Sequence, residues 1–522
     1  MHLARIEAAA STQSRPRRSP FRFVVQVFAP LTFPFSTFTF PAFAPFRSAS
    51  QTLRAASRFA FAATLLTLVA GCGNTYRPVV SAINPVGPAA QPQKFAVAIS
   101  SPGGTSPGLV TFVDFSGDSI LITANVGVDP YYLVLNSGGT IGYTLNGDGT
   151  LTSFGISTAL LSSQIFQTTL LNSNNVVPAS LFPQGTFTYV SQPNNNPGAA
   201  YTTPPLGRNS IAEFTGGSPL SLQQELPINT AYSPIYVAGI TGGSRSFAIS
   251  QAINGGPGQV ATIENTTTAT IDPNPITVGR GPVYGVETAD ARRVFIMNQT
   301  DGTVSVINAQ TNGLDIVPSG ATNPITVGTS PLWADFAPTR NELVVANAGD
   351  GVNPGSVSIV SIPLCTATTQ VTNPNCDINN PVDANGFGTV LATVPVGVNP
   401  RMVGVLQDGT RAYVVNGGDP TQPCGPAVGS LPPNCSVSVV NLTTNTVTST
   451  IPLVTTPIVP GVTLTNNGHP NYIAVTTGTP TGKVYVTSPE SDFMTVIRTD
   501  IDAVDTTIPL QGAGVSVRVT AP

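Results

Sequence analysis

Residues 282–308 read PVYGVETADARRVFIMNQTDGTVSVIN, which is three strand-like runs separated by two turns. The first two runs are rich in apolar residues. The third, Thr303–Asn308, alternates polar and apolar side chains, which is the period of a half-buried strand. Asp301-Gly302 is a tight-turn sequence, and a fourth apolar run follows at Ile325–Gly328. Four short strands with turns between them predict one antiparallel sheet.

The same unit recurs along the chain. A proline is followed 16 residues later by a small polar residue that ends a strand-like run. The five pairs are Pro130/Asn146, Pro234/Ser250, Pro282/Asn298, Pro331/Asn347 and Pro400/Asn416. Repeats of about 40–50 residues are typical of propellers and solenoids. We therefore predict an all-β propeller of four-stranded blades over residues 94–522.

Counting second strands gives eight blades, and seven remain possible because the copy around Tyr189 is weak. The first unit lacks a clear innermost strand, whereas Gly514–Val519 is a spare strand after a complete unit. We expect this last strand to insert into the first blade, because such closure removes exposed sheet edges.

Several of the repeated strands resemble the YVTN family of β-propeller repeats. The residues that carry this resemblance are Ala412–Asn416 (AYVVN), Val484–Ser488 (VYVTS) and the Val-Gly-x-x-Pro lead-ins at Val278, Val327 and Val396. The resemblance implies a propeller and leaves the function open, because one fold hosts many functions.

The front of the chain resembles a bacterial lipoprotein precursor. Basic residues and a short apolar run precede Val-Ala-Gly-Cys at 69–72, so we expect a signal peptide at 54–72 and lipid on the thiol of Cys72. An ordinary signal peptide with a coincidental cysteine is the alternative. Residues 1–53 fit no part of the fold and are expected to be a wrongly assigned upstream segment. Residues 73–93 form a Pro-rich tether.

These features predict a protein anchored in the bacterial cell envelope, on the periplasmic side or at the surface of the outer membrane. Gly73 after the lipidated cysteine favours the outer membrane. Beyond residue 72 there are 21 − 8 = 13 basic and 25 − 1 = 24 acidic residues, a net charge of −11. Nucleic-acid binding needs clustered Lys and Arg, so we do not expect it. We expect a monomer.

Four cysteines remain after Cys72, in two pairs with ten residues between the partners. The first pair lies between a third and a fourth strand, and the second pair between a second and a third strand. These loops emerge on opposite faces of a blade, so cross-pairing would exceed the span of a disulfide. We predict Cys365–Cys376 and Cys424–Cys435. A zinc site that uses all four cysteines is the rival interpretation.

Candidate binding residues are few. His469 is the only histidine besides His2, and a multi-histidine metal site is thereby excluded. His469 and Arg401 are expected near the funnel of the propeller, and Trp333 is either a core residue or part of the funnel wall. The recurring asparagines either line the funnel or cap the following turn. They are Asn146, Asn298, Asn347 and Asn416.

Two functions compete. The first is a binding or scaffold module that presents a disc face to a protein, a peptide or a cell-envelope polymer. The second is a lactonase-like hydrolase of the 6-phosphogluconolactonase type, which would need His469, Arg401 and Glu287 at one cavity. A redox propeller is a weaker third idea, because a Cys-x-x-Cys-His haem motif is lacking. No cofactor or metal is expected, and the lining of the funnel separates the first two functions.

Overall fold

The computed structural model describes residues 95–156, 166–170, 177–193, 209–215, 220–266, 268–315, 322–363, 386–425, 432–453, 468–476 and 482–520. All of them belong to one compact unit, Tyr76–Pro522, and all of its named elements are strands. None of the described segments forms a helix with the length and apolar character needed to cross a bilayer.

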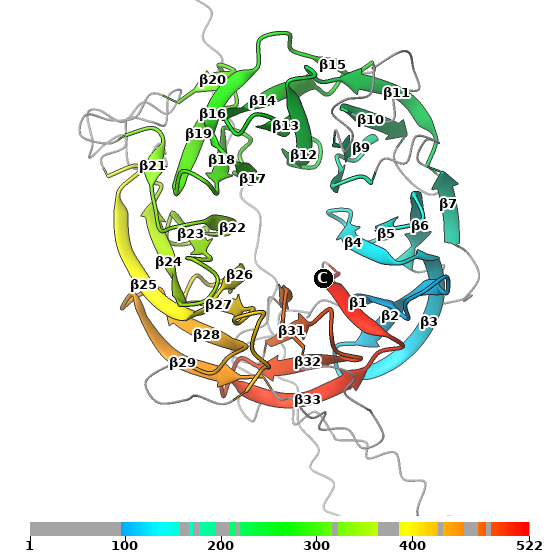
Figure 1. Cartoon of the computed structure of the whole chain (residues 1–522), viewed down its shortest axis with the longest axis vertical. Helices are drawn as coiled ribbons and strands as arrows, with labels where there is room; N and C mark the ends of the chain where they lie inside the picture. The colour runs from blue at the N-terminus through cyan, green and yellow to red at the C-terminus, as the bar shows by residue number, and fades with distance from the viewer. Residues whose placement is uncertain are drawn as a thin grey trace, which may run out of the picture. The chain divides into compact units, whose positions relative to one another are not determined.

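The strands form eight sheets arranged as blades around a central axis, with one edge strand of each sheet at the centre and the other at the rim (Figure 1). Every ladder that joins neighbouring strands within a sheet is antiparallel. In all but the first blade, the chain runs from the innermost strand outward and then crosses to the innermost strand of the next blade.

The first four blades contain the following strands, in order from the axis outward. Blade 1 contains β34 (Ala513–Val519), β1 (Phe95–Ser101), β2 (Pro107–Asp114) and β3 (Ser119–Val128). Blade 2 contains β4 (Pro130–Leu135), β5 (Ile141–Asn146), β6 (Thr150–Gly155) and β7 (Phe166–Leu170). Blade 3 contains β8 (Ser180–Pro183), β9 (Phe187–Gln192), β10 (Ser210–Thr215) and β11 (Leu222–Pro227). Blade 4 contains β12 (Tyr232–Gly239), β13 (Arg245–Ala252), β14 (Pro257–Glu264) and two outer segments, β15 (Thr270–Ile271) and β16 (Ile276–Arg280).

The other four blades follow the same order. Blade 5 contains β17 (Pro282–Glu287), β18 (Arg293–Asn298), β19 (Thr303–Asn308) and two outer segments, β20 (Gly313–Leu314) and β21 (Ile325–Thr326). Blade 6 contains β22 (Pro331–Ala337), β23 (Glu342–Asn347), β24 (Pro354–Ser361) and β25 (Val390–Val398). Blade 7 contains β26 (Pro400–Val405), β27 (Arg411–Asn416), β28 (Ser436–Asn441) and β29 (Thr446–Pro452). Blade 8 contains β30 (Tyr472–Val475), β31 (Lys483–Thr487), β32 (Phe493–Arg498) and β33 (Ala503–Pro509).

The sequence prediction of an eight-bladed propeller closed by the C-terminal strand is confirmed. The weak copy around Tyr189 is a complete blade of four strands, so the seven-bladed alternative is wrong. β34 pairs with β1 from Ala96↔Val519 to Ser101↔Ala513, and Phe95 N donates to Thr520 Oγ1 across 425 residues of sequence. The first and last strands of the propeller thereby share one blade.

The recurring interval of 16 residues is the register of the inner hairpin. Pro282 is the Cα partner of Asn298, and Pro331 is the partner of Asn347. In four of the five copies the residue before the proline has a positive φ, for example 58° at Ser330. Its carbonyl accepts a hydrogen bond from the residue after the asparagine, with Ala348 N at 2.8 Å. In these four copies one turn geometry leads from the rim of a blade to the axis of the next.

The core is divided among the junctions between blades. Eight clusters of buried apolar side chains each draw their members from two adjacent blades. Within β18, Val294 and Ile296 pack toward blade 4, whereas Phe295 and Met297 pack toward blade 6. Because both faces of a blade are buried, its second strand is apolar at successive positions rather than at alternate ones.

The predicted Cys424–Cys435 disulfide is present, with Cα atoms 5.1 Å apart, in the loop between β27 and β28. Cys72, Cys365 and Cys376 lie outside the described residues, as do the predicted segments 1–53, 54–72 and 73–93. The lipidation of Cys72 and the Cys365–Cys376 pairing therefore stay predictions.

Candidate functional site

The recurring asparagines are buried at the junctions between blades. Each is at most 1% exposed, and each donates from Nδ2 to hydroxyls on the third strand of its own blade. Asn416 donates to Ser436 Oγ at 3.1 Å and to Ser438 Oγ at 2.9 Å. Gly397 of the preceding blade donates its N–H to the same Ser438 hydroxyl at 3.3 Å. The shared hydroxyl thus links the two blades, and the amides that bind it are not exposed in a funnel.

This network also explains the glycine of the Val-Gly-x-x-Pro lead-in. A Cβ on Gly397 would lie 2.6 Å from Nδ2 of Asn416, and a Cβ on Gly328 would lie 2.6 Å from Nδ2 of Asn347. These distances are shorter than van der Waals contact, so any larger residue would displace the amide. The recurring motif is therefore a packing motif.

Aromatic residues gather at the inner ends of the blades, just below the repeated prolines. In five blades the ladder shifts register between the proline and the second residue after it, so one residue bulges out. The residue at that second position is aromatic or Met in these blades and in blade 8. The six residues are Tyr132, Tyr236, Tyr284, Trp333, Met402 and Tyr472.

Four of these side chains form a continuous arc. Trp333 stacks on Tyr284 with ring centroids 3.9 Å apart, and Tyr284 lies 4.9 Å from Tyr236. A hydrogen bond joins the side chains of Tyr236 and Tyr132, and burial raises the pKa of both phenols well above their usual range. These phenols therefore stay neutral and keep their hydrogens at physiological pH. Trp333 is half-buried and contacts the cores of three blade junctions, so it combines the two expected roles.

A hollow of about 690 Å³ opens where blades 1, 2 and 8 meet, at the same ends of the inner strands as the repeated prolines. Its wall includes the side chains of two acidic residues, two tyrosines, one serine and one asparagine, with small residues and prolines between them. These six are Ser101, Asp129, Tyr131, Asn471, Tyr472 and Asp492. The described lining contains neither Arg nor His.

The wall of the hollow is held in place by contacts with three blades. Asp129 Oδ1 accepts a hydrogen bond from Ser101 Oγ at 3.0 Å, and the Tyr131 hydroxyl donates to the carbonyl of Pro178 at 2.7 Å. The guanidinium carbon of Arg518 lies 5.0 Å from the centre of the Tyr472 ring, a cation–π contact. Asp492 Oδ1 is buried and has no hydrogen-bond partner among the described residues. The wall therefore combines fixed aromatic rings with two acidic residues, one of which, Asp492, has a buried and unsatisfied carboxylate oxygen.

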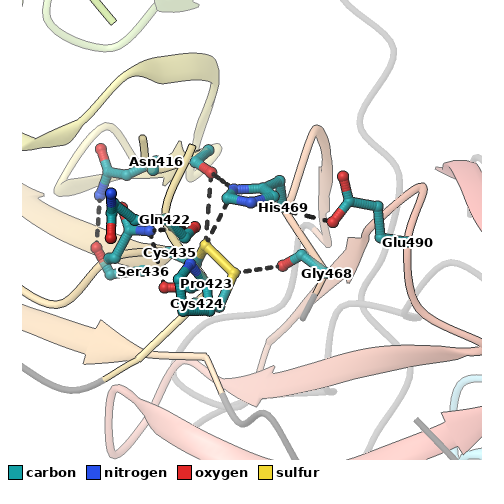
Figure 2. Close-up of a disulfide and its surroundings, with 12 residues drawn as sticks. Asn416, Gln422, Pro423, Cys424, Cys435, Ser436, Gly468, His469 and Glu490 are labelled. Carbon is teal, nitrogen blue, oxygen red and sulfur yellow. Dashed lines mark hydrogen bonds and ion pairs between the residues drawn. A yellow bond between two sulfur atoms is a disulfide. The ribbon is translucent and has the colours of Figure 1, made fainter. Parts of the chain in front are cut away.

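His469 lies near the hollow but is engaged elsewhere (Figure 2). Its Nδ1 donates to the carbonyl of Gly417 at 2.7 Å and lies 3.5 Å from Cys435 Sγ. Its Nε2 lies 4.0 Å from Glu490 Oε2. Because a carbonyl oxygen can only accept, Nδ1 carries the ring proton in this arrangement.

The three residues needed for a hydrolase do not converge. Arg401 is exposed, and its side chain packs beside Gly417, the residue whose carbonyl His469 contacts. A Cβ added to Gly417 would lie 3.2 Å from Arg401 Cγ. Glu287 ends β17 opposite Val294, whereas Pro282 begins that strand at the proline end. Six strand residues span about 17 Å, so Glu287 lies at the other face of the disc. Burial first, and then the charge of Asp290, raises the pKa of Glu287 to about 8.

None of the site residues predicted from the sequence lines the hollow. Tyr472 carried a usable signal, because it stands two residues after Pro470, as Tyr284 and Trp333 do after their prolines. Asp129 and Asp492 carried none, since they are 363 residues apart in the sequence and meet only because the last strand closes the first blade.

No protein-family model matches the chain, and no curated protein matches it. Among solved structures, it is similar to the dihydro-heme d1 dehydrogenase NirN in complex with DHE, with a TM-score of 0.52 and 10% identity over 81% of this chain and 75% of that chain. Apo AztD from Citrobacter koseri gives a TM-score of 0.49 and 10% identity over 82% of this chain and 98% of that chain. A putative 6-phosphogluconolactonase from Bacteroides fragilis gives a TM-score of 0.46 and 12% identity over 83% of this chain and 99% of that chain.

These neighbours are β-propeller proteins. The chain is a β-propeller. At 10–12% identity the likeness extends to the fold alone, so the function of the propeller has to be argued from its own residues.

Proposed function

We propose that the chain is a lipid-anchored, extracytoplasmic binding module that holds a protein, peptide or other cell-envelope ligand at the hollow between blades 1, 2 and 8. The observation that carries this proposal is the lining of the hollow. Aromatic rings and hydrogen-bonding groups converge there, and Arg and His are missing from its described wall. Its volume of about 690 Å³ is within the range of ligand pockets in proteins.

The chemistry of the wall favours a ligand that carries positive charge. Asp129 and Asp492 contribute two carboxylates, and the ring of Tyr131 offers a face to which cations are attracted, whereas Tyr472 already carries Arg518. An amine or guanidinium could pair with these carboxylates while its carbon stem packs on the Tyr131 ring. A peptide with an exposed Lys or Arg meets these requirements.

The anchor would set where this binding takes place. Lipid on Cys72 would fix the chain to a membrane, and the 21 residues of the 73–93 tether could extend to about 70 Å. The propeller could then present its ligand face well away from the bilayer surface. Replacing Cys72 with Ser should release the protein from the membrane fraction and remove the lipid mass. A membrane-bound Cys72→Ser protein of unchanged mass would contradict the anchor.

The central experiment is site-specific photo-crosslinking of the full chain in intact cells. A photoreactive residue at Asn471, in the wall of the hollow, should capture one dominant partner. The same residue at Ile501, which is 57% exposed in the turn between β32 and β33, is the matched control. Asp129→Asn combined with Asp492→Asn should weaken capture at Asn471 by at least about tenfold, because two charge-assisted contacts are lost. Equal capture from both positions would overturn the proposal.

The lactonase-like alternative is weakened by the position of Glu287, which is remote from Arg401 and His469. Incubating the purified full chain with a panel of lactones tests it directly. Hydrolysis that disappears in Arg401→Ala and in His469→Ala would move the function from binding to catalysis.

A further inference from the structure

We propose that Cys424, Cys435 and His469 form a redox-controlled site for Zn²⁺: the disulfide state excludes the metal, and reduction creates a three-ligand Cys₂His site. Both sulfur atoms and a ring nitrogen of His469 lie within 4.8 Å of one another. Two thiolates and an imidazole are ligands that zinc prefers. The inference is independent of the ligand proposed for the hollow.

The existing distances need little change to accept a metal. In a tetrahedral site with Zn–S near 2.3 Å and Zn–N near 2.0 Å, sulfur and nitrogen are about 3.5 Å apart and two sulfurs about 3.8 Å apart. His469 Nδ1 is already 3.5 Å from Cys435 Sγ. Two movements are needed: the sulfurs separate after the S–S bond breaks, and His469 Nδ1 leaves the carbonyl of Gly417, which lies 2.7 Å away.

The loop that carries the cysteines is held together by more than the disulfide. Asn434 Nδ2 donates to the carbonyls of Gln422 and Pro423, each at 3.0 Å, and Asn434 Oδ1 accepts from Asp419 N at 2.7 Å. Gly425 N also donates to Asn434 O at 3.0 Å. Asn434 is next to Cys435, and its partners Gln422, Pro423 and Gly425 lie within two residues of Cys424. We therefore expect the two thiols to stay near each other after reduction.

Glu490 lies where a small movement would let it support a zinc-bound histidine. Metal-ligating imidazoles commonly donate their second N–H to a carboxylate, which orients the ring and strengthens the ligand. Glu490 Oε2 is 4.0 Å from His469 Nε2, on the side of the ring away from the sulfurs (Figure 2). For Nδ1 to bind zinc, the ring proton moves from Nδ1 to Nε2, where it faces this carboxylate.

The chemistry balances with a dithiol as reductant. The protein disulfide and the dithiol exchange to give two protein thiols and the oxidised, cyclic disulfide of the reductant. Binding of Zn²⁺ then releases one proton from each thiol, while His469 binds as a neutral imidazole. Three protein ligands leave the fourth position of a tetrahedral zinc ion for water or an incoming ligand, so the site would be able to exchange its metal.

The test uses Co²⁺ as a spectroscopic probe and Zn²⁺ as its competitor, on the purified full chain. The chain is reduced with a phosphine, freed of reductant under anaerobic conditions and titrated with Co²⁺. We expect thiolate-to-cobalt charge-transfer and tetrahedral d–d bands, one equivalent bound per chain, and displacement of Co²⁺ by Zn²⁺. The oxidised chain should show none of these bands. Identical spectra from the oxidised and reduced chains would overturn the proposal.

Three variants assign the ligands. Cys424→Ser with Cys435→Ser should abolish the bands, and His469→Ala should weaken Zn²⁺ binding at least about tenfold and alter the d–d bands. Cys365→Ser with Cys376→Ser is the matched control and should retain full binding, because it removes an equal number of thiols elsewhere. Binding that survives loss of Cys424 and Cys435, or that is unaffected by His469→Ala, would refute the site. Thermal unfolding of the oxidised proteins verifies that the variants fold.

Discussion

The junctions between blades and the hollow between blades 1, 2 and 8 are built differently. At the junctions the same residues recur, and each serves packing: Gly397 leaves room for Asn416, and Asn416 bonds to Ser438. Around the hollow, Asp492 belongs to no repeat and has a free carboxylate oxygen. In this propeller the recurring glycines and asparagines hold blades together, whereas the acidic residues of the hollow belong to no repeat.

The largest effect should follow from removing residues 514–522, which make up most of β34. β1 would lose its antiparallel partner, and the buried Val517 would be lost from the junction of blades 8 and 1. We expect the free energy of unfolding to fall by more than about 5 kcal/mol, since a strand ladder and several buried side chains disappear. Chemical denaturation followed by Trp333 fluorescence measures it, with a deletion of 521–522 as the control. Unchanged stability would show that closure does not hold the ring.

The next effect concerns the recurring packing motif. Gly397→Ala should lower the free energy of unfolding by about 1–3 kcal/mol, because its Cβ would lie 2.6 Å from Asn416 Nδ2. Gly313→Ala is a matched control, since a Cβ at Gly313 would have nothing within 4 Å. That variant should stay within about 0.5 kcal/mol of the parent chain. If Gly397→Ala and Gly313→Ala changed the free energy of unfolding equally, the motif would not be a packing motif.

Glu287 lies at the opposite face of the disc from the hollow and is buried. Its substitution should therefore change stability without changing binding at the hollow. Its pKa is raised to about 8 in the folded chain, mainly by burial. In the unfolded chain the pKa is close to 4.3, so the folded state binds the extra proton between these values. Stability is therefore greatest below the unfolded pKa and falls as pH rises through the folded pKa near 8.

The free energy of unfolding is measured between pH 5 and pH 9, because this range covers the expected loss of stability. Glu287→Gln should flatten the dependence and stabilise the chain at the alkaline end by about 2 kcal/mol, because a neutral amide needs no deprotonation there. Partner capture at Asn471 should be unchanged. A Glu287→Gln profile parallel to that of the parent chain would contradict the raised pKa.

The smallest effect on stability is expected at the hollow itself. Asp129→Asn with Asp492→Asn should change the free energy of unfolding by less than about 0.5 kcal/mol, although it weakens partner capture. Asn is also tolerated at position 129, where φ is 52°. Asn416→Ala should do the reverse, lowering stability by about 1–3 kcal/mol and leaving capture intact. If stability and partner capture changed together in both variants, the separation of packing residues from binding residues would be wrong.

The sequence allowed the fold to be predicted in detail because its repeats encode local geometry. The interval from Pro282 to Asn298 is the register of one hairpin, and such a register is set by residues that are close in the chain. The placement of Cys424 and Cys435 in one loop followed from the same strand order. These are short-range relations that repeat, so the pattern could be recognised from a single sequence.

The candidate site could not be predicted in the same way. The wall of the hollow joins Asp129 of the blade 1–2 turn to Asp492 of blade 8, and no periodicity relates them. The proximity of His469 to Cys435 depends on how blade 8 packs against blade 7, through the carbonyl of Gly417. Even the recurring asparagines were ambiguous in the sequence, since burial between blades and exposure in a funnel require the same spacing.

The pairing of β34 with β1 has a consequence for the order in which the protein is made. A ribosome releases β1 among the first strands of the propeller and β34 last, and their contacts span up to 425 residues. Blades 2 to 8 can each form as soon as their own strands emerge, whereas β1 keeps an unpaired edge until β34 has been synthesised. The closed ring and the hollow beside β34 therefore form only after β34 has emerged.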